Sequence, residues 1–192
     1  KYYPNLVVVH IDAHTDTYRS DSNQDYMRYN VATTFTRAAE EGLIDVAASM
    51  HVGPRGPTND NTVFDYTRDV GFKLVDGHEL FETGLANTAN SLVSDLQGRD
   101  VYLCFDMDFF DPSCAPGVCT PTWGGASARE GLGFLQALSG LNVVGADINT
   151  VSPPHDVGGM TAFLAGTVAL EILTLFCHAK GLITDNGQPA CS

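Results

Sequence analysis

The stretch "VVVHIDAHTDTY" (residues 7–18) joins an apolar run to three residues of the types that bind metals. The run "NLVVVHI" (5–11) is almost continuously apolar, which is typical of a strand buried on both faces of a parallel sheet. Asp12, His14 and Asp16 follow at every second position. Because alternate residues of an extended segment share one face, we expect these three side chains to converge. The pattern predicts a metal site, with a polar turn after the strand as the simpler alternative.

Strands and helices are predicted to alternate along the chain. The predicted strands cover residues 5–11, 47–53, 72–77, 100–110 and 142–151. The predicted helices cover residues 33–44, 59–71, 78–98, 127–140 and 160–181. This alternation indicates one α/β domain over residues 1–192 with a mostly parallel sheet. Ligands bind at the carboxyl ends of strands in such sheets, and three polar motifs (12–16, 106–111 and 149–156) follow predicted strands.

The net charge and the hydropathy of the chain indicate which kinds of partner the protein could bind. The net charge is -13, from 10 Lys and Arg against 23 Asp and Glu, so we expect neither nucleic acid nor an anionic membrane as a partner. A cationic substrate or bound metal ions suit this charge, and simple solubility is the alternative reading. No apolar run approaches the roughly 18 residues of a membrane span and no signal peptide is evident, so we expect a cytoplasmic protein. The five cysteines have no CxxC spacing, so reduced thiols are expected.

A second acidic motif, "CFDMDFFDP" (104–112), follows another predicted buried strand. Asp106 and Asp108 are expected to share a face there, with Asp111 beginning the turn. Carboxylates gathered from both motifs would repel one another strongly unless cations compensated them. Oxygen ligands with an imidazole suit Mn²⁺, or Ni²⁺, Co²⁺ or Fe²⁺, and a pair of such ions roughly 3.5–4 Å apart activates a shared water. The alternative is a capped turn and a surface acidic loop.

Five motifs, including these two acidic segments, follow one another along the chain. They are "DAHTD" (12–16), "FDMDFFDPSCAPGVCTP" (105–121), "GG" (124–125), "DINTVSPPHD" (147–156) and "GGMTAFLA" (158–165). Together they resemble the ureohydrolase family, which comprises arginases, agmatinases, guanidino-acid hydrolases and formiminoglutamases. The resemblance runs from residue 7 to about residue 180. It implies a three-layer α/β/α fold and a homo-oligomer, either a trimer or a hexamer.

The resemblance also implies roles for five residues. Asp12 and Asp106 would bridge two divalent cations, most readily Mn²⁺ and alternatively Ni²⁺. His14 and Asp108 would bind one cation, and Asp16 would bind the other and act as the general base. A hydroxide shared by the cations would attack the carbon of a small cationic guanidino substrate and release urea and an amine.

The sequence departs from the family before the first motif. The family carries an upstream Gly-Gly-Asp-His segment whose His completes the metal site, and this chain begins only 11 residues before Asp12. His10 lies on the same face as Asp12, but one strand period inside the apolar run, so we do not expect it to replace that ligand. We therefore expect the C-terminal two-thirds of the fold, with the N-terminal strands missing and one sheet edge exposed.

Further departures concern the substrate. Thr150 stands where the resemblance places a Glu that pairs with the guanidinium, which favours guanidine or another unusual substrate over agmatine and arginine. Val31 stands where a proton-shuttling His is usual, with Asn30 as the nearest polar residue. Trp123 and His155 fall in loops expected near the substrate. The alternatives are a formimino-group hydrolase and a catalytically impaired metal-binding member of the family.

Overall fold

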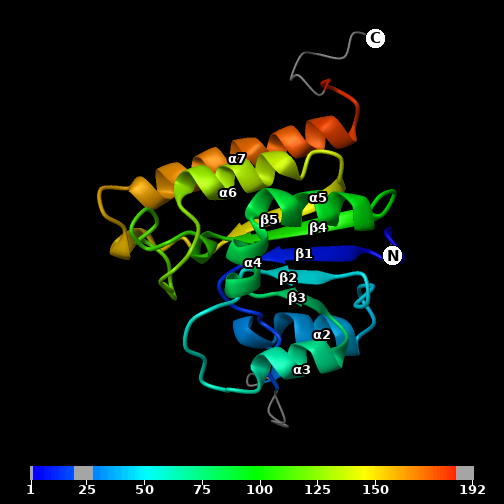
Figure 1. Cartoon of the computed structure of the whole chain (residues 1–192), viewed down its shortest axis with the longest axis horizontal. Helices are drawn as coiled ribbons and strands as arrows, with labels where there is room; N and C mark the ends of the chain where they lie inside the picture. Colours follow the sequence, from blue (N-terminus) through cyan, green and yellow to red (C-terminus); the bar gives the residue numbers. More distant parts are fainter. Residues whose placement is uncertain (1, 20–27, 185–192) are drawn as a thin grey trace.

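Five parallel strands form the central sheet of the computed structural model, which describes residues 2–19 and 28–184 (Figure 1). The strands run in the order β3-β2-β1-β4-β5. Their bounds are β1 (Val7–Ile11), β2 (Met50–Val52), β3 (Lys73–Val75), β4 (Asp100–Asp106) and β5 (Asn142–Asn149). Each neighbouring pair is parallel, which confirms the predicted α/β sheet.

Helices connect these strands. The α-helices are α2 (Thr34–Glu40), α3 (Val63–Val70), α4 (Gly77–Thr83), α5 (Leu85–Asp95), α6 (Ala128–Ala137) and α7 (Met160–Ala179). The short 3₁₀ helices are η1 (Val31–Thr33), η2 (Met107–Phe109) and η3 (Pro153–His155). The helix expected over 78–98 is divided into α4 and α5, because Gly84 has a φ of 87° that helical geometry does not allow. The strand expected over 100–110 ends at Asp106, where η2 begins.

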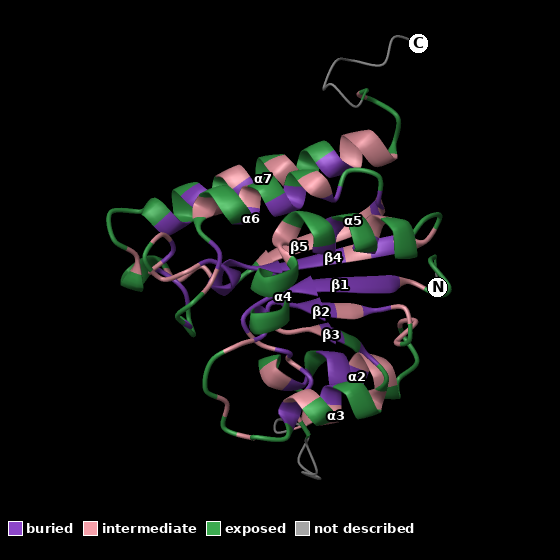
Figure 2. Cartoon of the chain, in the orientation of Figure 1, coloured by how far each residue is buried: buried purple, intermediate pink, exposed green. Residues whose placement is uncertain are grey.

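The buried strand β1 separates two apolar layers, and Figure 2 shows it buried along its length. Val7, Val9 and Ile11 belong to the larger core, which also contains residues of α4, α5, α6 and α7. Val8 faces the other side and packs with Phe35 at the start of α2 and with Phe72 after α3. The alternation of β1 thus builds helices on both faces of the sheet, and the predicted three-layer α/β/α fold is confirmed.

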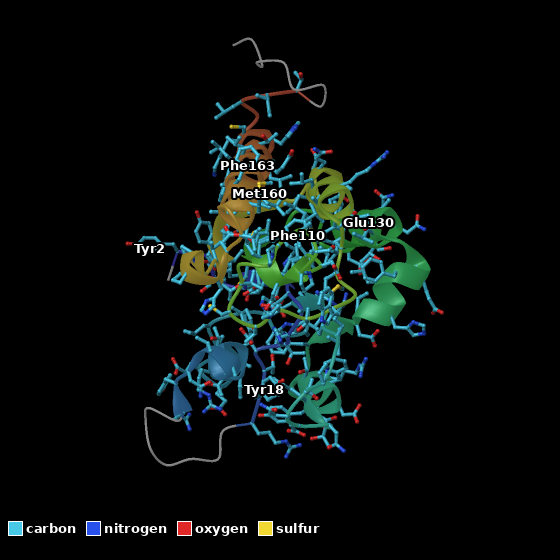
Figure 3. The ribbon with its side chains drawn as sticks, turned by 90° about the vertical axis from the view of Figure 1, so that its left-hand side faces the viewer. Tyr2, Tyr18, Phe110, Glu130, Met160 and Phe163 are labelled. Atoms are coloured by element: carbon cyan, nitrogen blue, oxygen red, sulfur yellow. The ribbon has the colours of Figure 1, made fainter. Side chains whose placement is uncertain are left out.

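Helix α7 lies against β5 and α6 (Figure 1). Its inward side buries five residues: Thr161, Leu164, Val168, Ile172 and Leu175. Its outer side carries an exposed apolar stripe, defined here as Met160, Phe163, Leu170 and Leu173; Figure 3 shows the first two close together on the helix. β5 has one strand neighbour among the described strands, so it forms an open edge of the sheet.

The expectation that no apolar run approaches a membrane span is wrong for α7. Among the described residues, the helix Met160–Ala179 is long and apolar enough to cross a membrane by length and composition alone. These two criteria carry little weight alone, because core helices of globular domains also meet them. The inward side of α7 contributes to the main core, as expected of a helix of the outer layer.

Candidate metal centre

The two acidic motifs meet at the carboxyl ends of β1 and β4, which are adjacent parallel strands. Ile11 pairs in register with Phe105, so Asp12 and Asp106 leave the sheet side by side. An open cavity of about 720 Å³ lies at this edge. Its lining includes the predicted site residues Asp12, His14, Asp16, Asn30, Asp106, Asp108 and Thr150. The structure therefore brings together all five predicted metal ligands, as expected from their positions after two neighbouring strands.

The first motif converges through turns rather than through an extended segment. β1 ends at Ile11, and the Asp12 carboxylate immediately accepts the backbone N–H of His14 at 2.6 Å. Asp16 has a φ of 47°, in the left-handed region that non-glycine residues seldom occupy. The expected convergence of these residues is confirmed, but its cause is this compact turn, and the left-handed Asp16 is typical of strained positions at functional sites.

Asp108 ties the second motif to the first. Its Oδ1 accepts the backbone N–H of Ala13 at 3.0 Å, and its Oδ2 accepts the hydroxyl of Thr120 at 3.1 Å. The same Oδ2 lies 3.0 Å from Nδ1 of His14, which is also 3.2 Å from Oδ1 of Asp12. Asp106 caps η2 by accepting the backbone N–H of Asp108 at 2.8 Å. These contacts fix the acidic side chains before any ligand binds.

Two groups of donor atoms are compact enough to hold a cation. Asp12, His14 and Asp108 form one group, and His10, Asp12 and Asp16 form the other, with ligand atoms within 4.8 Å of one another in each. Asp12 belongs to both, which suits a carboxylate that bridges two ions. Asp106 lines the same cavity but belongs to neither group; its Oδ1 accepts the Asp108 N–H and the hydroxyl of Thr150.

The pKa values of the cavity residues are shifted because several carboxylates are buried close together. Burial raises the pKa of Asp106 to about 9, and the charges of Asp12 and Asp108 act in the same direction. Burial and the charge of Asp12 raise the pKa of Asp16 to about 6. Burial would lower the pKa of His14, but Asp108 and Asp12 outweigh it and raise that pKa to about 10. Divalent cations would replace these protons as counter-charges, and the oxygen and imidazole donors suit Mn²⁺ or Ni²⁺.

The predicted substrate residues divide into two pairs. Thr150 lines the cavity with a φ of 66°, and its hydroxyl donates to Asp106. Asn30 also lines the cavity, where its side chain accepts the N–H of Ala32 and caps η1. Trp123 is 75% exposed and His155 bonds to Ser152 within an exposed loop, and both lie outside the cavity lining. Their placement gives no support to a contact with substrate.

Two features of the site were not predicted from the sequence. His10 reaches Asp12, with Nε2 lying 2.9 Å from Oδ2, and the signal available was their shared face two residues apart. Arg55 donates to backbone carbonyls around the second motif, which no sequence motif indicated. It therefore holds the loop beneath the site.

Comparisons with known proteins agree with this geometry. Residues 1–175 match the arginase family. The chain is 38% identical to the proclavaminate amidinohydrolase of Streptomyces clavuligerus, over 91% of the chain and 55% of that protein. It is 35% identical to an agmatinase of Neisseria meningitidis, over 91% of the chain and 53% of that protein. The chain thus spans about half the length of the curated relatives it matches.

Solved structures show the same fold. The structure of the Streptomyces clavuligerus proclavaminate amidinohydrolase superposes with a TM-score of 0.84 at 38% identity, covering 93% of this chain and 58% of that one. The structure of a formimidoylglutamase from Bacillus subtilis superposes with a TM-score of 0.80 at 25% identity, covering 89% of this chain and 53% of that one.

Proposed function

This chain belongs to the arginase family, and from that premise we propose that the protein is a binuclear metal-dependent hydrolase of a guanidino-type C–N bond. The reaction adds water to the guanidinium carbon, breaks one C–N bond and releases urea and an amine. The observation that carries the proposal is the pair of compact donor groups that share Asp12 at the floor of one cavity. Relatives named agmatinase and amidinohydrolase support the reaction class.

Five residues of this chain would hold two divalent cations, with Mn²⁺ first and Ni²⁺ second. Asp12 is the shared ligand, His14 and Asp108 belong with one ion, and Asp16 and Asp106 complete the acidic surround. Bound ions of this kind lower the pKa of a water so that it is a nucleophile near neutral pH. The raised pKa values of Asp16 and Asp106 support the fit, because burial and the neighbouring carboxylates outweigh the positive charge near these two carboxyls.

Asp16 is our candidate general base. Its carboxyl lines the cavity, and burial together with the charge of Asp12 raises its pKa to about 6. A group that titrates near the working pH can both accept the proton of the attacking water and deliver it to the leaving amine. The left-handed backbone at Asp16 aims this carboxyl back toward Asp12 rather than along the chain.

The substrate is proposed to be a small cation recognised by hydrogen bonds rather than by a dedicated ion pair. The hydroxyl of Thr150 donates a hydrogen bond to Asp106, so the lone pairs of the hydroxyl oxygen remain to accept guanidinium N–H groups. Val31 is exposed and lines the cavity, and it adds no charge there. An agmatine-like amine, guanidine and a guanidino acid all fit this description.

The second candidate reaction is hydrolysis of a formimino group. The likeness to a formimidoylglutamase structure favours it, because the same donor set serves either amidine-type carbon. The third candidate is a metal-binding member of the family with impaired catalysis, which the uncharged Val31 and Thr150 favour. We further propose a cytoplasmic homo-oligomer, either a trimer or a hexamer, that binds no nucleic acid; light scattering would measure its assembly.

The decisive experiment uses the protein at its full natural length, loaded with Mn²⁺ or Ni²⁺. Release of urea and formamide is measured with agmatine, guanidine, guanidinopropionate and formiminoglutamate. Asp12→Asn and Asp106→Asn should abolish turnover and reduce bound metal, because each removes a negative charge from between two cations. Asp69→Asn, an exposed carboxylate on α3, is the matched control and should retain activity. A protein that binds two ions yet releases neither product would refute the catalytic proposal.

A further inference from the structure

A line of buried polar contacts runs from Asp12 away from the cavity. Nε2 of His10 lies 2.9 Å from Oδ2 of Asp12, and Nδ1 of His10 lies 2.8 Å from Nδ1 of His51. Nε2 of His51 lies 3.2 Å from the hydroxyl of Thr17. Both imidazoles are 1% exposed, and neither lines the cavity. We call this line, Asp12–His10–His51–Thr17, the imidazole relay.

We propose that His10 is a positioning residue for Asp12, held in place by His51 and Thr17. The proposal rests on the metal site proposed above. It assigns His10, which the second donor group includes as a possible ligand, to a place behind Asp12 instead, and it adds His51 and Thr17 as residues that support His10. Outer residues of this kind orient a metal ligand and tune its affinity.

The sheet itself builds the relay. His10 on β1 and His51 on β2 are register partners, so their side chains leave the same face of adjacent parallel strands. Phe35 packs against the His10 ring with centroids 4.4 Å apart, and Phe72 packs against the His51 ring at 4.7 Å. This apolar surround restricts the two rings, since rotating either one would open a void in a close-packed core.

The direction of the hydrogen bonds follows from Asp12. Oδ2 of Asp12 lies against Nε2 of His10, and a carboxylate only accepts hydrogen bonds. Nε2 of His10 must therefore present its hydrogen toward Oδ2. The Thr17 hydroxyl donates its one hydrogen to the carbonyl oxygen of Thr15, so it accepts from Nε2 of His51. A neutral His51 then accepts at Nδ1 from Nδ1 of His10.

The relay leaves the two Asp12 oxygens with different partners. Oδ1 accepts the backbone N–H of His14, while Oδ2 faces His10. The Nε2–H of His10 faces Oδ2 at 2.9 Å but off the line of a well-formed hydrogen bond, so the attraction between them is mainly electrostatic. Without His10, Oδ2 would lose this contact, and the backbone N–H of His14 at Oδ1 alone would orient the shared carboxylate less firmly.

The test compares variants of the full-length protein by Mn²⁺ calorimetry and thermal unfolding. His10→Phe keeps a planar ring but removes the donor, and it should weaken Mn²⁺ binding by about 10- to 100-fold. His10→Gln restores a donor amide and should recover most of that affinity. Leu138→Ala, in the larger core on the other face of the sheet, should lower the melting temperature while leaving the affinity within about twofold of wild type.

Several results would overturn the proposal. One is a Mn²⁺ affinity of His10→Phe equal to that of the wild type. Another is an equal loss of Mn²⁺ affinity in His10→Gln and His10→Phe. A third is a direct Mn²⁺–nitrogen coupling that disappears with His10→Phe, which would make His10 a ligand. Should His10→Phe fail to fold, Thr17→Val removes only the outer hydroxyl, and an unchanged affinity there would count against the relay. A wild-type protein that binds no Mn²⁺ would instead refute the proposed metal site itself.

Discussion

Arg55 offers the sharpest test of how the loops beneath the site are held. Its guanidinium donates to five backbone carbonyls: those of Gly53, Asp108, Phe110, Thr122 and Trp123. The bonds to Asp108 and Thr122 are the shortest, at 2.8 Å each. One planar fork thereby joins the segment after β2 to the loop that carries the second acidic motif. We predict that Arg55→Lys loosens this connection even though the charge is retained.

The expected loss follows from the number of bonds that an ammonium cannot replace. A hydrogen bond to a charged group contributes about 1.5–3 kcal/mol, and Lys should keep one of the two short bonds. The remaining bonds are longer and the side chain is half-buried, so we expect a loss of about 2 kcal/mol. In a domain of this size that corresponds to a melting temperature lower by about 4–8 °C.

The assay is thermal unfolding followed by circular dichroism, with Arg68→Lys as the control. Arg68 is exposed and pairs with Asp65 at 3.7 Å, so its replacement should shift the midpoint by less than about 2 °C. Because Arg55 also bonds to the backbone of Asp108, its replacement should weaken Mn²⁺ binding as well. Equal melting temperatures for the two variants would refute the assigned role of the fork.

Two further predictions concern packing and pH. Gly131→Ala should lower the free energy of unfolding by about 1–3 kcal/mol, because the new Cβ would lie 2.2 Å from the Phe110 ring. Gly133→Ala on the same helix has open space and should raise it by about 0.5–1 kcal/mol. Denaturant titration measures both, and changes of the same sign would contradict this packing. Metal-free Asp16 and Asp106 hold protons up to about pH 6 and 9, above the usual range of a carboxyl, so stability without metal should fall as pH rises through this window while Mn²⁺ affinity rises. Calorimetry in buffers of different ionisation enthalpy would detect the released protons, and a pH-independent affinity would contradict these protonation states.

The core of the site was predictable because it depends on strand ends. The residue that follows a buried parallel strand lies at the carboxyl edge of the sheet. Asp12 and Asp106 therefore lie close together because β1 and β4 are neighbours. The almost continuous apolar run of β1 likewise predicted that helices cover both faces of the sheet. These inferences need only periodicity and the geometry of a parallel sheet.

The rest depends on contacts between segments far apart in the sequence. Arg55 meets the loop around Thr122 only in three dimensions, and His10 meets His51 only through the β1–β2 register. Period-two reasoning predicted an extended path for Asp16, yet a left-handed turn places it. Trp123 lies in the expected loop but points to solvent, because a loop position does not set the direction of a side chain.

The open edge at β5 links the completion of the sheet to the chemistry of the site. β5 runs directly into Thr150, whose hydroxyl rests on Asp106. An edge strand presents unpaired backbone donors and acceptors, and a parallel strand added there would finish at the cavity edge, beside these two residues. The exposed stripe of α7 lies on the neighbouring helix, so a segment that pairs with β5 also finds apolar surface nearby. A strand that pairs with this edge would therefore end beside Thr150 and Asp106 and would form part of the cavity wall.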